Sequence, residues 1–177
     1  VLTIIFVGLA WLAAASRAAW PGEVAALTLI RPLANESLVV FFILITYLAS
    51  WPTIVFLGFI SAVLLNRRAR LQAIIFIAAT VLAEIITILT KELVRRPRPA
   101  FENEILSLTS FGFPSGHAMV GMVFYGLLSY FFFKKPRRYW ARLTVAVGGA
   151  ALIFLICFSR LYLGVHWPLD VVGGWFA

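Results

Sequence analysis

Apolar stretches long enough to cross a lipid bilayer recur along this chain, and they restrict its fold more than any other feature. The hydrocarbon core of a bilayer is about 30 Å thick, which an apolar helix of about 20 residues crosses. Hydrophobic residues make up 63% of the chain and charged residues only 12%, where a water-soluble domain carries about 25% charged residues. The sequence therefore predicts an all-α fold, a polytopic membrane helix bundle that forms one domain over residues 1–177.

Six transmembrane helices are expected, together with one short helical segment on the membrane surface. The expected spans cover residues 1–15, about 52–65, 71–94, 116–133 and 140–158, and a sixth begins at Pro168 with ten residues present. Proline is favourable in the first turn of a helix. The surface segment is expected at residues 23–37, which mix Ala and Leu with Arg31, Pro32, Asn35 and Glu36.

One apolar run is too long for a single straight span. It covers Leu38 to Leu65, 28 residues, and contains Trp51-Pro52. At about 1.5 Å per residue such a helix exceeds the hydrocarbon core. Proline disfavours helix in the residue before it, so a break before Pro52 is the preferred interpretation. One long kinked helix is the alternative.

Basic residues cluster at the ends of the apolar runs, which is how they orient membrane helices. The net charge is +8, and two basic loops, at residues 66–70 and 134–138, are separated by two expected spans. The two loops therefore lie on one face, and the positive-inside tendency makes that face cytoplasmic. This placement disfavours a nucleic-acid partner and indicates a multi-pass protein of the cell membrane.

A first polar segment, residues 91–99, follows the expected third span. Lys91 lies in the last turns of that helix, and Pro97 and Pro99 end it and place Arg98 on a turn. One cation from a helix and one from a turn can surround a tetrahedral anion. The alternative is a basic cluster against lipid headgroups, but this segment falls on the non-cytoplasmic side, where positive charge is disfavoured. Arg95 and Arg96 are expected to be ordinary surface charges.

A second polar segment, residues 113–117, precedes the expected fourth span. Ser115 is expected to be its N-cap, and Gly116 allows the backbone to approach a ligand closely. The amides of a helix N-terminus form a favourable site for an anion. His117 then projects from the first turn, where a structural histidine is the alternative to a catalytic one.

A third polar segment, residues 159–170, joins the last two expected spans. Arg160 ends the fifth span and His166 precedes the sixth. Asp170, the only aspartate, follows His166 by four residues and is close enough to accept from its imidazole and fix the tautomer. A carboxylate that simply stabilises the helix N-terminus is the alternative. All three polar segments are expected at the same non-cytoplasmic face.

These groups favour the transfer of a phosphate-like anion, with one histidine attacking and the other protonating the leaving oxygen. One aspartate and two histidines are too few for a two-metal phosphatase, and an aspartyl-phosphate route needs a second aspartate. A cysteine phosphatase would need an arginine six positions after Cys157, where Leu163 stands. Cys157 is the sole cysteine, so the chain has no internal disulfide.

With these residues in place, the chain resembles the type 2 phosphatidic acid phosphatase superfamily, whose members are lipid phosphate phosphatases. The first motif of that family, Lys-x6-Arg-Pro, matches Lys91 with Arg98-Pro99. The second, Pro-Ser-Gly-His, matches residues 114–117, and the third, Ser-Arg-x5-His-x3-Asp, matches residues 159–170. All three occur in the order of the family.

The resemblance implies a role for each matched residue. His166 is implied as the nucleophile that forms a phosphohistidine, Asp170 as the group that orients it, and His117 as the general acid. The implied phosphate-binding residues are Lys91, Arg98, Ser115, Gly116 and Arg160. The family needs no metal or other cofactor, and its membrane members have a six-helix core with the site at the outer face.

The function predicted is the hydrolysis of a phosphomonoester or diphosphate of a membrane lipid. The resemblance is closest to small bacterial members that act on phosphatidylglycerol phosphate, phosphatidic acid or undecaprenyl diphosphate. A lipid A phosphatase, a lipid phosphotransferase and a non-enzymatic lipid carrier are alternatives. Intramembrane Glu84 is interpreted as supporting the site rather than as a transport residue, because it lies seven residues before Lys91 on about the same helix face. The oligomeric state is not predicted.

Overall fold

The computed structural model describes residues 1–16, 19–66, 70–101, 105–106, 108–134 and 138–177. All regular secondary structure in these residues is helical, which confirms the predicted fold class. The helices are α1 (Leu2–Ala15), α2 (Pro21–Ile30), the 3-10 turn η1 (Arg31–Leu33), α3 (Glu36–Tyr47), α4 (Trp51–Asn66), α5 (Arg70–Val94), α6 (Gly116–Phe133), α7 (Tyr139–Tyr162) and α8 (Pro168–Phe176).

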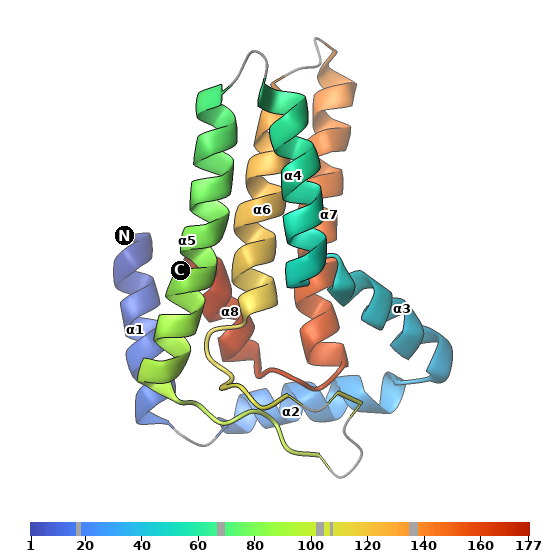
Figure 1. Ribbon diagram of the computed structural model, residues 1–177. Helices are drawn as coiled ribbons and strands as arrows, with labels where there is room; N and C mark the ends of the chain where they lie inside the picture. The colour runs from blue at the N-terminus through green and yellow to red at the C-terminus, as the bar shows by residue number, and fades with distance from the viewer. Residues whose placement is uncertain (17–18, 67–69, 102–104, 107, 135–137) are drawn as a thin grey trace.

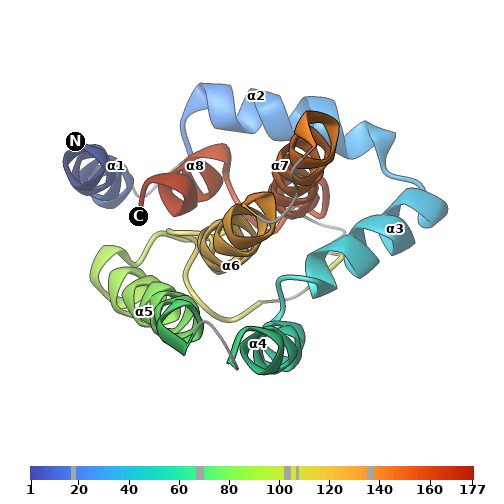
Figure 2. The ribbon, with the colours of Figure 1, turned by 90° about the horizontal axis from the view of Figure 1, so that it is seen from above.

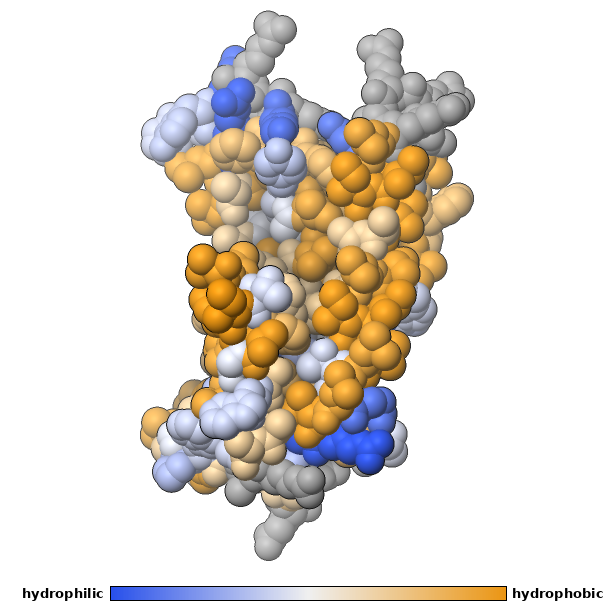
Figure 3. Space-filling model, turned by 90° about the vertical axis from the view of Figure 1, so that its left-hand side faces the viewer, coloured by the Kyte–Doolittle hydropathy of each residue, from blue (hydrophilic) through white to orange (hydrophobic). Residues whose placement is uncertain are grey.

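Helix α6 lies at the centre of the bundle and packs against α5, α7 and α8 (Figure 2). Within the described ranges, α5, α6 and α7 are each long and apolar enough to cross a bilayer, and the apolar helix α1 and the apolar part of α4 are shorter. Side chains on the face viewed in Figure 3 form an apolar band between more polar ends. This pattern is that of a protein whose sides contact lipid.

The chain breaks before Pro52, as predicted, and α3 and α4 are separate helices that meet at an angle (Figure 1). Helix α3 ends at Tyr47 and α4 begins at Trp51, so Pro52 lies in the first turn of α4. A first-turn residue has no helical carbonyl partner for its N–H, and proline therefore disrupts nothing there. The single kinked helix is excluded.

Helix α2 lies across one end of the bundle, roughly perpendicular to α5, α6 and α7 (Figure 1). A helix is thus present where the surface segment was predicted, but it begins at Pro21, and the chain turns by 119° between the helical segment that ends at Leu33 and α3. Asn35 caps α3 by accepting from the amide of Leu38 at 3.0 Å. Glu23, placed at the surface by the sequence, is instead buried with 8% exposure.

Small and aromatic residues hold the central helices together. The rings of Phe76 on α5 and Phe124 on α6 are both buried, with centroids 4.8 Å apart. Gly149 on α7 faces α6 so closely that a Cβ atom there would lie 2.0 Å from the hydroxyl oxygen of Ser129. Close backbone approach at small residues is how membrane helices associate, because lipid tails are as apolar as the helix faces.

The three polar segments meet at one end of the bundle. The C-terminal ends of α5 and α7 and the N-terminal ends of α6 and α8 all lie there, next to α2 (Figure 1). The ends of α4 and α6 and the beginnings of α5 and α7 lie at the opposite end. Residues 67–69 and 135–137 of the two predicted basic loops fall outside the described residues.

Candidate active site

A cavity of about 330 Å³ lies where the three polar segments meet. Six of the eight residues predicted for the site line it: Lys91, Arg98, Gly116, His117, Arg160 and His166. The other two are fully buried: Ser115 directly precedes Gly116 in the chain, and Asp170 contacts His166. Apolar side chains such as Ile54 and Val120 also line the cavity, which therefore combines cationic and apolar groups.

The first polar segment turns inward immediately after α5. The helix ends at Val94, and Arg95 has φ of +50°, in the left-handed region that commonly terminates a helix. Lys91, in the last turn of α5, donates to the carbonyl oxygen of Phe111 and lines the cavity. The residues after Arg95 are non-helical, as the two prolines predict, and they carry Arg98 to the cavity.

Arg98 fixes the tautomer of His166. Its NH1 group lies 2.9 Å from Nε2 of His166 and donates to the carbonyl of Val165 at 2.7 Å. Because arginine only donates, Nε2 must be the accepting, unprotonated nitrogen, and the ring hydrogen is on Nδ1. The lone pair that could attack phosphorus is thus held by Arg98 at the cavity wall.

The imidazole of His166 is kept neutral. It is 2% exposed, and burial together with the nearby charges of Arg98 and Arg160 lowers its pKa well below the usual 6.5. A backbone hydrogen bond to Gly112 acts in the opposite direction but does not outweigh burial. A neutral imidazole has the free lone pair that a nucleophile requires.

Asp170 lies directly behind His166. Its Oδ2 atom is 3.3 Å from Nδ1 of His166 and accepts from the amide of Trp167 at 2.9 Å. The second contact caps α8, so the same carboxylate stabilises the helix N-terminus and orients the histidine. The contacts of Asp170 are those that both interpretations from the sequence require, and its role in orienting His166 stays a prediction.

Ser115 occupies the N-cap position of α6, as predicted, but its hydroxyl makes no capping hydrogen bond. Its amide donates to the carbonyl of Asp170 at 2.9 Å, and its buried Oγ atom has no partner among the residues that the structure describes. An unpaired buried hydroxyl is unfavourable, and a ligand oxygen would satisfy it. Gly116 follows, packed so tightly that a Cβ atom would lie 3.2 Å from Thr87.

Arg160 lies in the last turns of α7 and is 3% exposed. Its NH1 group donates to the hydroxyl of Thr46 at 2.7 Å, and its buried Nε atom has no partner in the described part of the chain. Arg160, Lys91 and Arg98 thus bring three positive charges to one partly apolar cavity. Like charges repel strongly where water is scarce, and an anion in the cavity would relieve that repulsion.

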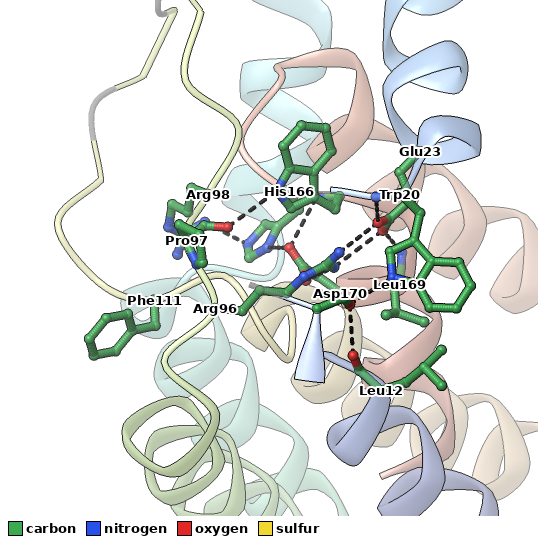
Figure 4. Close-up of polar contacts among 12 residues, drawn as sticks. Leu12, Trp20, Glu23, Arg96, Pro97, Arg98, Phe111, His166, Leu169 and Asp170 are labelled. Carbon is green, nitrogen blue, oxygen red and sulfur yellow. Dashed lines mark hydrogen bonds and ion pairs between the residues drawn. The ribbon is translucent and has the colours of Figure 1, made fainter. Parts of the chain in front are cut away.

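Arg96 is the principal correction to the sequence analysis. Arg95 is exposed and pairs with Glu92 at 3.7 Å, as a surface charge does. Arg96, expected to be a surface charge as well, is fully buried between Asp170 and Glu23 (Figure 4). In an extended segment alternate residues point to the same side, so the contact of Arg98 with the site was a signal that Arg96 also faces inward.

Three further residues near the site were not predicted: Glu23, Thr46 and Ser110. Ser110 accepts from Arg98 through its carbonyl at 2.6 Å and its hydroxyl at 3.0 Å, and Thr46 holds Arg160. Glu84 lines the same cavity as Lys91. In the described residues no three His, Cys, Asp or Glu side chains gather as a metal ion would require.

The fold and the site together define a helical membrane protein with a cationic cavity, containing two histidines, at one end of its bundle. The sequence profile of the PAP2 superfamily matches residues 72–177, which include all three polar segments. The chain belongs to the PAP2 superfamily, as the three motifs predicted.

Two relatives show the extent of the similarity. The chain is 38% identical over 85 residues to phosphatidylglycerophosphatase B of Bacillus subtilis (strain 168). The aligned region covers 48% of this chain and 41% of that protein. It is 32% identical over 117 residues to the undecaprenyl-diphosphatase of Sulfolobus acidocaldarius, 63% of this chain and 52% of that protein. The matches thus span about half the length of these relatives.

The fold also matches a solved structure. The crystal structure of the first transmembrane PAP2 type phosphatidylglycerolphosphate phosphatase, from Bacillus subtilis, superposes with a TM-score of 0.83 at 26% sequence identity. The match covers 99% of this chain and 87% of the other. The similarity therefore includes α1, α2, α3 and α4, which lie outside the region matched by the family profile.

Proposed function

We propose that this protein is an integral membrane lipid phosphatase that hydrolyses a phosphomonoester or diphosphate of a membrane lipid through a phosphohistidine. One observation carries the proposal: a neutral histidine whose unprotonated nitrogen lies, in contact with Arg98, at a cavity lined by three cationic side chains. The names of the relatives, which are phosphatases of lipid phosphates, support it.

The phosphate is proposed to lie among Lys91, Arg98 and Arg160. These cations hold its unbridged oxygens and stabilise the charge that develops on them during transfer. The unpaired hydroxyl of Ser115 and the amide of Gly116, at the N-terminus of α6, complete the set of donors. Arg98 releases Nε2 of His166 and takes a phosphate oxygen instead, because one NH1 group cannot hold the nitrogen while phosphorus approaches it.

The proposed reaction has two steps. Nε2 of His166 attacks phosphorus, the bond from phosphorus to the leaving oxygen breaks, and His117 gives that oxygen a proton. Asp170 stabilises the positive charge of the phosphorylated ring through Nδ1–H. Water, deprotonated by His117, then attacks phosphorus, and the bond to Nε2 breaks to give inorganic phosphate and the free histidine.

The apolar part of the substrate is proposed to lie between α4 and α5. A second cavity, of about 290 Å³, is lined by apolar side chains of these helices such as Val55, Phe59 and Ile77. It shares Trp51 and Ile54 with the cationic cavity, so the two are adjacent. A lipid with its phosphate among the cations has a route for its chains toward the bilayer.

The site is proposed to face the non-cytoplasmic side of the cell membrane. The positive-inside tendency supports this orientation, because two basic stretches of the sequence connect helices whose ends lie away from the site. Phosphatidylglycerol phosphate, phosphatidic acid and undecaprenyl diphosphate are the proposed substrate candidates.

Phosphate release from these three lipids in detergent tests the proposal. Wild-type protein should release phosphate from at least one of them, and folded His166→Ala should release none. Exposed Tyr139, far from the cavity, provides a control, since Tyr139→Phe should retain full activity. Phosphate release by His166→Ala comparable to wild type would refute the role of His166, and no release by wild type from any lipid phosphate would refute the function.

A further inference from the structure

Buried Arg96, which lies outside the cavity, connects Glu23 of α2 to Asp170, the residue behind the proposed nucleophile His166. We propose that Arg96 and Glu23 are positioning residues that hold the carboxylate of Asp170 in the orientation His166 requires. The proposal rests on the proposed function, because it assigns these residues to the same reaction. Neither residue is among the phosphate-binding residues implied by the family motifs.

The guanidinium of Arg96 joins two carboxylates from distant parts of the chain (Figure 4). NH1 lies 2.9 Å from Oδ1 of Asp170 and 3.2 Å from Oε1 of Glu23, and NH2 lies 2.6 Å from Oε2 of Glu23. The planar fork of arginine suits this arrangement, and the point charge of a lysine does not. Both carboxylates are thus held by one rigid group.

Arg96 determines which oxygen of Asp170 faces His166. It occupies Oδ1, which leaves Oδ2 for Nδ1 of His166 and the amide of Trp167. The backbone of Gly112 closes over this arrangement: its amide donates to the carbonyl of Arg96 at 2.8 Å, and a Cβ atom there would lie 2.9 Å from Oδ2 of Asp170. The carboxylate therefore has little freedom to rotate.

Glu23 supplies the charge that Arg96 needs. Without Glu23, only Asp170 would balance the positive charge of Arg96. The attraction of the Asp170 carboxylate for a positively charged His166 ring would then be weaker. Glu23 also accepts from the amides of Leu169 at 3.0 Å and Trp20 at 3.0 Å, which fastens the beginning of α2 to the beginning of α8. The pair thus sets both the position and the effective charge of Asp170.

This role predicts a particular kinetic effect. Neither Arg96 nor Glu23 lines the cationic cavity, so neither contacts a phosphate held there. Their loss should lower kcat and leave KM unchanged. Partners that orient metal-ligating histidines from behind change activity by about tenfold to a hundredfold when they are mutated, and an effect of about that size is expected here by analogy.

The two adjacent arginines provide a matched experiment. Arg96→Gln removes the buried fork, and Arg95→Gln makes the same chemical change at an exposed position. Phosphate release is measured per folded molecule in detergent, with the folded fraction taken from gel filtration. Arg96→Gln should lower kcat by about tenfold or more with KM unchanged, and Arg95→Gln should match wild type.

Glu23→Gln is a second variant that tests the same proposal if Arg96→Gln does not fold. Glutamine keeps the size of the side chain and one acceptor oxygen, enough for the amide of Leu169 or of Trp20 but not for both, and it loses the charge that balances Arg96, so kcat should fall with KM unchanged. The proton on Nδ1 of His166 gives a second measurement by NMR, independent of turnover. Its resonance should be displaced downfield in wild type and should move upfield or be lost in both variants.

Each outcome decides the proposal. Unchanged kcat in both folded variants, with the wild-type proton resonance, would show that Glu23 and Arg96 only stabilise the fold and would overturn it. A change in KM alone would place them in phosphate binding and would also overturn it. If wild type and Arg95→Gln release no phosphate from any lipid, the proposed function fails, and the proton resonance alone then decides whether Arg96 positions Asp170.

Discussion

Replacing Asp170 by Asn isolates the electrostatic part of the proposed mechanism. When Nε2 of His166 bonds to phosphorus while Nδ1 keeps its hydrogen, the ring becomes positively charged next to the carboxylate, whose Oδ2 lies 3.3 Å from Nδ1. Unit charges about 4 Å apart at an effective dielectric of 20 attract by about 4 kcal/mol. Each 1.4 kcal/mol is about tenfold in rate, so Asp170→Asn should lower kcat by about a thousandfold.

The amide cannot imitate the carboxylate at this position. Asp170 accepts hydrogen bonds on both oxygens, from Arg96 on one and from His166 and Trp167 on the other. An asparagine has one carbonyl oxygen, so its NH2 group must face a donor on one side. Facing Nδ1–H, it would disfavour the tautomer that leaves Nε2 free, as in a serine protease triad with the same substitution.

Single-turnover phosphate release measures this loss directly. The inhibition constant of inorganic phosphate depends on binding in the cationic cavity and not on attack by His166. It should therefore be unchanged in folded Asp170→Asn protein. Glu92→Gln, which removes an exposed carboxylate paired with Arg95, is the control and should behave as wild type. A reduction of less than about tenfold would refute the argument, because the ring would then carry no significant charge in the transition state.

Other predictions concern the histidine, metals and topology. Burial and nearby cations lower the pKa of His166 well below 6.5, so its ring should remain neutral from pH 8 to pH 6. Constant ¹⁵N chemical shifts of the ring over that range would confirm this, and a titration near pH 6.5 would contradict it. EDTA should leave phosphate release intact, and a strict magnesium requirement would refute the proposed mechanism. Tags at Arg68 and Arg137 should report the cytoplasm and a tag at Glu102 the outside, and reversed labelling would overturn the orientation.

The course of the chain was predictable because it depends on local rules. Proline ended α5 and separated α3 from α4, and apolar length located α6 to the residue. The three polar segments met at one end because an even number of spans returns the chain to the same face. Six predicted residues line one cavity for this reason.

The contacts behind the cavity could not be predicted in the same way. Glu23 lies 73 residues from Arg96, and the sequence has no local pattern that pairs them. A glutamate after Pro21-Gly22 is ordinary at the start of a surface helix, where a negative charge is favourable without any partner. Arg96 is one of four basic residues in this segment, and the alternation that places it on the same side as Arg98 gave no indication of its two carboxylate partners.

The contact between Glu23 and Arg96 limits how small a working fragment of this protein can be. Residues 72–177 carry every motif by which the family is recognised, but not Glu23. A fragment that begins at α5 would leave Arg96 with one carboxylate instead of two and the amide of Leu169 without its acceptor. If Arg96 and Glu23 position Asp170 as proposed, a chimera that transplants the family motifs also needs α2 from the same protein.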